Sequence, residues 1–325
     1  MKTSYVTLTL TILLVLTGQH DAIGGILSKR DPSIMAKELG LAENPVNVNG
    51  ISRLYYSYVP ESLRGQKNIP ALLVFHGGGR GATFIAQTTN FKPYADKFGF
   101  AVIYPQAADS KGRWQVGRDS TNTSDDIGYT KALLKDVYSK YNISPKRVFA
   151  SGISSGGSFS HRLACEMPGY FQAFGILAAN MIIEQAPKCK PSKASPIVIF
   201  AGTEDRFMLF NGGQSDLKIL RNRRGESQGV ISHPATVQKW VTLNNCQSAG
   251  PVVKLPDRDP DDGTTVTVQL FDNCDDNAKI KDYVIHGGGH NWPGAGTNYN
   301  RLTGYVSQDI DANAEMIKFF KQYGL

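Results

Sequence analysis

The segment 148–157, VFASGISSGG, constrains the fold of this chain more than any other stretch. An apolar run enters a turn with the pattern G-x-S-x-G, and a helix-competent segment, 158–165, follows. In such an elbow a strand turns sharply into a helix, and the apex serine, here Ser154, adopts a strained backbone conformation with an exposed hydroxyl. Side chains two positions away would collide with the strand and helix, which accounts for Gly152 and Gly156. The pattern predicts a nucleophilic serine; the alternative is a glycine-rich turn with only a structural role.

Apolar runs and helix-compatible segments alternate along the whole chain. Runs such as 70–75 are continuously apolar, as strands buried on both faces are, whereas 264–271 alternates like an exposed or edge strand. Strands are expected at 53–59, 70–75, 100–104, 173–178, 195–201, 264–271 and 281–285, and helices at 91–98, 124–141, 236–244 and 310–323. This order predicts an α/β fold of the α/β-hydrolase type, with a mostly parallel central sheet and helices on both faces. No repeat or linker interrupts 31–325, so we expect one catalytic domain there.

Two further side chains are positioned to activate the serine. A serine hydroxyl needs a base, and the base needs a third group to orient it. In hydrolases with this elbow the chain order is serine, acid, histidine, each after a strand. Ser154, Asp205 and His290 follow that order, so we predict them as nucleophile, acid and base.

Each of the last two assignments has rivals. His286 directly follows the last expected strand, but three glycines separate it from His290 and let that loop curl back toward the serine. Glu204 and Asp216 are the rival acids. The side chain of Glu204, one residue before Asp205, would point in another direction, and Asp216 lies deep in a polar loop, 214–232. The remaining histidines are placed less well. His20 lies in the leader, His76 lies in the glycine-rich loop, and His161 and His233 do not follow an expected strand.

The segment 76–79, HGGG, follows the buried strand 70–75 and fits an oxyanion loop. We expect the backbone N–H of Gly78 or its neighbour to pair with that of Ser155 and stabilise a tetrahedral oxyanion. Trp114 and Trp292 are candidates to stack on an aromatic acyl group or a sugar ring, with core packing as the alternative. The sequence indicates no metal and no organic cofactor.

Several motifs together resemble those of one known family. They are HGG at 76–78, YPQA at 104–107, the turn into Trp114, DDIGY at 125–129, RVFASGISSGG at 147–157, LACE at 163–166, GTED at 202–205 and GGGHNWPG at 287–294. In these motifs the chain resembles secreted esterases of the poly(3-hydroxybutyrate) depolymerase and feruloyl or acetylxylan esterase type. The resemblance implies the same roles for Ser154, Asp205 and His290. The apolar segment 206–210 and the basic loop 218–224 depart from the family pattern.

The resemblance implies a secreted serine carboxylesterase that hydrolyses an extracellular polymer or its oligomers, as poly(3-hydroxybutyrate) depolymerases do. The alternative is a feruloyl or acetylxylan esterase of plant cell-wall polysaccharide. A serine peptidase ranks lower, because no propeller domain and no charged anchor for a peptide terminus is visible. A non-catalytic binding protein on the same scaffold also ranks lower, because candidates exist for every catalytic position.

The N-terminus and the cysteines both point to export. Residues 6–16 form an apolar run that suits a signal peptide, with cleavage after Gly18 or Ala22 and further processing at residue 30 as an option. Four cysteines in an oxidising compartment allow three connectivities, and their order favours Cys165–Cys189 and Cys246–Cys274. Asn122 and Asn142 lie in glycosylation sequons, which matter in a eukaryote.

The charge distribution limits the partners. The formal net charge is +7, without a Lys/Arg tract interleaved with aromatic residues, so a nucleic-acid partner is not indicated. No stretch beyond the leader is apolar enough to span a membrane. The partner we expect is an ester substrate, and the oligomeric state is not predicted.

Overall fold

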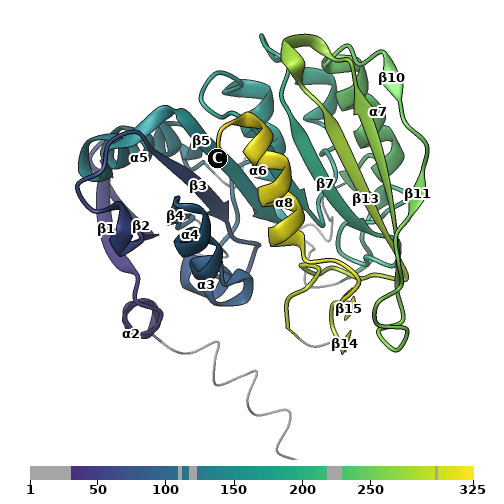
Figure 1. Ribbon diagram of the computed structural model, residues 1–325, viewed down its shortest axis with the longest axis horizontal. Helices are drawn as coiled ribbons and strands as arrows, with labels where there is room; N and C mark the ends of the chain where they lie inside the picture. Colours follow the sequence, from purple (N-terminus) through teal and green to yellow (C-terminus); the bar gives the residue numbers. More distant parts are fainter. Residues whose placement is uncertain (1–30, 109–111, 117–122, 218–228, 297–298) are drawn as a thin grey trace, which may run out of the picture.

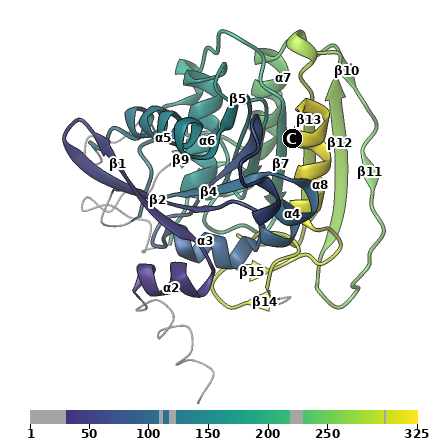
Figure 2. The same cartoon turned by 60° about the vertical axis from the view of Figure 1, so that its left-hand side comes forward.

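The computed structural model describes residues 31–108, 112–116, 123–217, 229–296 and 299–325. Its centre is an eleven-stranded sheet in the order β1-β2-β4-β3-β5-β6-β7-β13-β12-β10, with β11 paired to β12 (Figure 1). The helices pack on the two faces of this sheet, as Figure 2 shows from a second direction. This arrangement confirms the predicted α/β fold.

The strands in the middle of the sheet are parallel and those at its edges are antiparallel. The parallel strands are β4 (Ala101–Pro105), β3 (Ile69–Phe75), β5 (Ile143–Ile153), β6 (Phe174–Leu177), β7 (Ile197–Gly202) and β13 (Ile280–His286). The edge strands are β1 (Ala42–Val48) and β2 (Ile51–Tyr58) on one side and β12 (Thr265–Asp272), β10 (Ser248–Ala249) and β11 (Val253–Lys254) on the other. The carboxyl ends of the parallel strands meet at one edge, where a ligand site is expected in such sheets.

Side chains of the central strands alternate between two apolar clusters, one on each face. In β3, Leu73 and Phe75 belong to one cluster while Leu72 and Val74 belong to the other. The first cluster includes side chains of α5 (Asp126–Tyr141), α6 (Ser155–Glu166) and α7 (His233–Leu243). The second includes side chains of α2 (Pro32–Glu38), α3 (Ala82–Thr89), α4 (Lys92–Phe98) and α8 (Ala312–Phe320). Burial on both faces accounts for the continuous apolar runs in the sequence.

Polar caps and short elements complete the described chain. Asp125 caps α5, Ser232 caps α7 and Asp311 caps α8, each by accepting a hydrogen bond from a backbone N–H of the first turn. Two small antiparallel pairs lie outside the large sheet: β8 (Gly213–Gln214) with β9 (Gly229–Val230), and β14 (Tyr299–Asn300) with β15 (Gly304–Tyr305). Short 3-10 turns occupy Glu61–Leu63, Ala186–Lys188, Asp275–Asn277 and Lys321–Tyr323.

Of the remaining expectations, the structure tests the disulfide pairing. Both disulfides are present as predicted, Cys165–Cys189 and Cys246–Cys274. Asn142 ends α5 in a left-handed conformation with an exposed side chain. In the part of the chain that the structure describes, no helix is both long and apolar enough to cross a membrane. The proposed leader, Asn122 and the basic loop 218–224 lie outside the described residues.

Candidate active site

Ser154 occupies the apex of the turn between β5 and α6. Its backbone has φ 58° and ψ −124°, a strained conformation for a residue with a side chain. The turn is held from both sides, because the N–H of Ser154 donates to the carbonyl of Leu177 at 3.0 Å and its carbonyl accepts from the N–H of Ser158 at 2.8 Å. Ser154 itself is half-buried, at the N-terminus of α6, where partial positive charge accumulates.

The glycines two residues either side of Ser154 have no room for a side chain. A Cβ on Gly156 would lie 2.2 Å from the carbonyl oxygen of Phe75, and one on Gly152 would lie 2.5 Å from the carbonyl carbon of Gly156. Both clashes involve backbone, which cannot move aside as a flexible side chain can. The steric reason predicted for these two glycines is therefore confirmed.

His290 and Asp205 form a hydrogen-bonded pair. The Nδ1–H of His290 donates to Oδ2 of Asp205 at 2.7 Å, while Oδ1 of Asp205 accepts from the N–H groups of Phe207 and Met208, both at 2.8 Å. An ionised carboxylate only accepts hydrogen bonds, so this partner places the imidazole proton on Nδ1 and leaves a lone pair on Nε2. The half-buried ring of Phe207 stacks on the imidazole, with centroids 4.7 Å apart and planes 22° apart.

The loop that carries His290 is fixed against neighbouring segments. The N–H of His290 donates to the carbonyl of Thr303 at 2.7 Å, and the N–H of Gly289 donates to the carbonyl of Tyr305 at 3.0 Å. On the other side the loop crosses the end of β7 so closely that a Cβ on Gly202 would lie 2.3 Å from the carbonyl oxygen of Gly288. A Cβ on Gly289 itself would lie 1.9 Å from the carbonyl oxygen of Thr303, which explains the glycine directly before His290.

The rival residues have other surroundings. His286 is exposed and hydrogen-bonds the hydroxyl of Thr267 on β12 at 2.9 Å. Glu204 and Asp216 are exposed, and the carboxyl group that contacts His290 is that of Asp205. His161 on α6 is buried and does not contact the His290–Asp205 pair. It accepts a hydrogen bond from the indole of Trp240, and burial lowers its pKa to about 3.

A second buried histidine–carboxylate pair could not be predicted from the sequence. His233, the first residue of α7, hydrogen-bonds Asp282 of β13 through Nε2 at 2.8 Å and Asn180 through Nδ1 at 3.3 Å. Alternation within β13 is the one pattern that marks Asp282 as inward-facing, and a lone acidic residue there does not reveal its partner. The pair ties α7 to the sheet.

The glycine loop after β3 lies alongside the elbow. A Cβ on Gly77 would lie 3.3 Å from Cβ of Ser154, and one on Gly78 would lie 4.0 Å from Cβ of Ser155. Nε2 of His76 accepts from the N–H of Ala107 at 3.1 Å, so Nδ1 carries the proton and donates to the carbonyl of Gly77 at 2.9 Å. Burial lowers the pKa of His76 to about 4, which keeps the ring neutral.

This contact also orients the next peptide group. In a trans peptide the carbonyl and the N–H point in opposite directions, and the described chain contains no cis peptide bonds. Because the carbonyl of Gly77 faces the imidazole of His76, the N–H of Gly78 faces away from it. The loop thus holds a backbone donor in a fixed direction next to the elbow.

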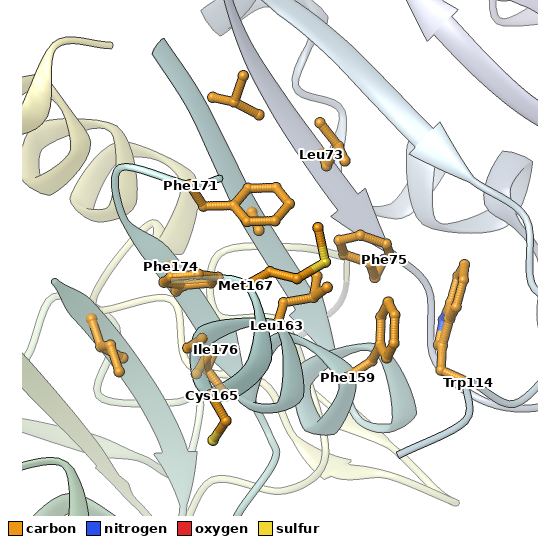
Figure 3. Close-up of a cluster of buried hydrophobic side chains, with 14 of the residues drawn as sticks. Leu73, Phe75, Trp114, Phe159, Leu163, Cys165, Met167, Phe171, Phe174 and Ile176 are labelled. Atoms are coloured by element: carbon orange, nitrogen blue, oxygen red, sulfur yellow. The ribbon is translucent and has the colours of Figure 1, made fainter. Parts of the chain in front are cut away.

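The two tryptophans predicted to stack on substrate are core residues. Trp114 is 2% exposed and packs against Phe75 and Phe159, as Figure 3 shows, with ring centroids 5.1 Å away in both cases. Trp292 is 3% exposed and its indole donates to Oδ1 of Asn313 at 2.9 Å. Neither ring presents a free face to a ligand, so the substrate-stacking prediction is wrong for both and the core-packing alternative holds.

The structure therefore brings Asp205 to His290 and the loop of Gly77 and Gly78 to the elbow of Ser154. Acyl transfer needs a base that a carboxylate orients, and the His290–Asp205 pair provides one. It also needs a backbone donor beside the nucleophilic serine, and the glycine loop next to Ser154 provides that. Among the described residues, no group of three or more histidine, cysteine, aspartate or glutamate side chains is arranged to hold a metal ion.

Comparison with known proteins gives relatives of one kind. The profile of the family described as "Esterase PHB depolymerase" matches residues 54–190. The chain is 26% identical over 235 residues to feruloyl esterase B of Piromyces equi, covering 71% of this chain and 41% of that protein. It is 29% identical over 175 residues to acetylxylan esterase A of Emericella nidulans, covering 52% of this chain and 55% of that protein. The chain thus spans about half the length of these relatives.

Solved structures support the fold. The acetyl xylan esterase from Aspergillus awamori superimposes with a TM-score of 0.57 at 16% identity, covering 86% of this chain and 99% of that one. The family profile includes the elbow and the glycine loop, whereas Asp205 and His290 lie beyond its end. The chain is therefore similar to esterases of the kind that this profile describes, and it has the fold of the α/β-hydrolases.

Proposed function

We propose that this protein is a serine carboxylesterase in which Ser154, His290 and Asp205 act as nucleophile, base and acid. The observation that carries the proposal is the hydrogen bond from Nδ1 of His290 to Asp205, which leaves Nε2 as the proton acceptor. An imidazole held in this tautomer is what a serine nucleophile requires. The strained apex position of Ser154 supports its role as the nucleophile.

The reaction proceeds in two steps. Ser154 Oγ attacks the ester carbonyl while Nε2 of His290 takes its proton, and the C–O bond to the alcohol breaks as the imidazolium returns that proton to the leaving oxygen. Water then attacks the acyl-enzyme by the same route and releases the acid. The backbone N–H groups of Gly78 and Ser155 stabilise the oxyanion in both steps.

The substrate class proposed here is an ester of a plant cell-wall polysaccharide, either a feruloyl or an acetyl ester. The support is that the named relatives are feruloyl and acetylxylan esterases. This substrate class replaces poly(3-hydroxybutyrate) as the leading expectation, because that polymer appears only in the description of the family profile. The two disulfides support action in an oxidising, extracellular compartment.

The proposal is tested on the secreted protein with p-nitrophenyl acetate. Ser154→Ala should lower kcat/KM by a factor of about 10⁴ or more, as loss of a nucleophile does in other serine hydrolases. The matched control is Ser158→Ala, one turn along the same helix. It removes a buried hydroxyl that has no hydrogen-bond partner among the described residues, so activity should stay within about twofold. Retention of activity by Ser154→Ala would remove the proposed nucleophile.

The base is tested in the same way by a pair of histidine variants. His290→Ala should abolish turnover, whereas His286→Ala, which changes an exposed side chain on β13, should not. The wild-type protein is then compared on methyl ferulate, acetylated xylan and hydroxybutyrate oligomers. A clear preference for the oligomers would contradict the polysaccharide assignment while leaving the triad intact.

A further inference from the structure

Trp114 contacts both segments that flank the proposed oxyanion site. Its backbone N–H donates to Oγ of Ser155 at 3.0 Å, and its indole N–H donates to the backbone carbonyl of His76 at 2.9 Å. Ser155 begins α6, and His76 precedes the glycine loop. One residue thus bridges the elbow and the glycine loop, which are 79 positions apart in the sequence.

The position of Trp114 is itself strongly fixed. Its ring stacks on that of Phe159 and meets Phe75 edge-on (Figure 3). It also stacks on the ring of Tyr129. The next residue, Gln115, donates its backbone N–H to Asp126 at 2.7 Å and accepts at its carbonyl from Arg162 at 2.9 Å. A residue held by packing and by its neighbour's hydrogen bonds can fix the spacing of the groups it contacts.

From these contacts we propose that Trp114 is a positioning residue that sets the distance between the two oxyanion donors, the N–H groups of Gly78 and Ser155. Trp114 does not touch the substrate. It acts through the carbonyl of His76 and the hydroxyl of Ser155. The inference rests on the proposed function, because it assumes that these two N–H groups face the oxyanion.

The consequence for catalysis follows from where charge develops. The carbonyl oxygen of the ester becomes negative in the transition state, so donors at the correct spacing stabilise that state more than the bound substrate. Loosening the spacing should therefore lower kcat and leave KM nearly unchanged. Displacements of about 1 Å in a catalytic site can cost a factor of about 10² in rate.

The test compares two tryptophan variants that each lose one indole hydrogen bond. Trp114→Phe removes the bond to His76 but keeps an aromatic ring. Trp240→Phe is the control, because Trp240 is also buried and donates to His161 at the same length, 2.9 Å, farther along α6. Both should lower the midpoint of thermal unfolding, so a general loss of stability affects both.

We expect Trp114→Phe to lower kcat about tenfold or more with KM within about twofold, and Trp240→Phe to leave kcat within about twofold. The affinity of Trp114→Phe for an arylboronic acid, which mimics the tetrahedral state, should fall in proportion to kcat/KM. If the two variants lose kcat equally, or if Trp114→Phe changes KM alone or changes neither constant, the proposal is overturned.

A second substitution covers the case in which Trp114→Phe does not fold. Replacement of Trp114 by β-(3-benzothienyl)alanine keeps the size and shape of the ring system and removes only the N–H donor. This protein should fold and show the same fall in kcat; wild-type kcat would contradict the proposal. Ser154→Ala measured alongside separates the two hypotheses, because its retained activity would reject the nucleophile whatever Trp114 does.

Discussion

The buried ion pair between Arg53 and Asp126 should be the most sensitive charged contact outside the active site. Nη2 of Arg53 donates to Oδ1 of Asp126 at 2.8 Å, and the two side chains are 7% and 0% exposed. The same guanidinium lies 4.0 Å from the centroid of the Tyr129 ring and donates to the carbonyl of Gln106 at 3.2 Å. Arg53→Met keeps most of the apolar stem and leaves a buried carboxylate without its counter-charge.

Breaking one side of a buried pair costs about 3–5 kcal/mol in the free energy of unfolding, because the remaining charge stays desolvated. At about 2 °C per kcal/mol for a chain of this size, Arg53→Met should lower the melting temperature by about 6–10 °C. The chain offers a matched control in Arg64 and Glu61, an ion pair of 2.9 Å whose side chains are 76% and 75% exposed. Arg64→Met should cost about 1 kcal/mol or less.

The assay is thermal and guanidinium unfolding of both variants and of the double variant Arg53→Met/Asp126→Asn. The asparagine removes the charge and keeps an acceptor for the N–H of Gln115 and the hydroxyl of Ser124, which Asp126 binds at 2.7 and 3.0 Å. The double variant should therefore recover at least half of the loss. The reasoning is refuted if Arg53→Met and Arg64→Met cost the same, or if the second substitution deepens the loss.

Three further predictions follow from the contacts described above. Gly156→Ala should prevent expression of soluble, active enzyme because its Cβ would lie 2.2 Å from a backbone carbonyl, whereas Gly169→Ala, with nothing within 4 Å, should behave as wild type in yield and turnover. The pKa of His161 is lowered by burial to about 3, so the unfolded chain binds a proton there below pH 6.5 that the folded chain does not, and stability falls as the pH drops from 6.5 toward 3. His161→Gln should reduce that slope, measured by urea unfolding, by about 1.4 kcal/mol per pH unit, and an unchanged slope would contradict the assignment. Removing Cys246–Cys274, which closes a loop with a sequence separation of 28, by substituting both cysteines with alanine should cost about 3–4 kcal/mol in chemical unfolding, and a cost below about 1 kcal/mol would show that the bond restrains little.

Short-range patterns explain why the elbow and most strands could be predicted. The sterics of Gly152, Ser154 and Gly156 involve residues within five positions, and the continuous apolar run of β3 requires only burial on both faces. Strand β1, by contrast, was not expected, because it contains proline and asparagines and few of its residues are buried. Its conformation comes from antiparallel pairing with β2. Helices α2 and α3 were also missed, since each is short and gains its stability from packing.

Long-range contacts explain where the sequence was insufficient. The order of residues predicted Asp205 and His290 over their rivals, but the hydrogen bond joins positions 85 residues apart and no local pattern specifies it. The prediction that Trp114 and Trp292 stack on substrate was wrong for the same reason. Whether Trp114 faces a ligand or the core depends on Phe75 and Phe159, which reach it from β3 and α6. Burial of an aromatic side chain is a property of the assembled layers.

Backbone contacts set the distance between the proposed nucleophile and the acid–base pair. Ser154 follows β5 and Asp205 follows β7, and only β6 lies between these two strands in the sheet. The N–H of Ser154 donates to the carbonyl of Leu177, and the N–H of Ala178 donates to the carbonyl of Phe200 at 2.9 Å. At the far side, the N–H of Glu204 donates to the carbonyl of Gly288 at 2.9 Å, in the loop that carries His290. A continuous line of main-chain hydrogen bonds thus crosses from the elbow to the histidine loop. Side-chain substitutions within 206–210 should therefore leave this separation in place, because the groups of that segment that hold Asp205 are the backbone N–H groups of Phe207 and Met208.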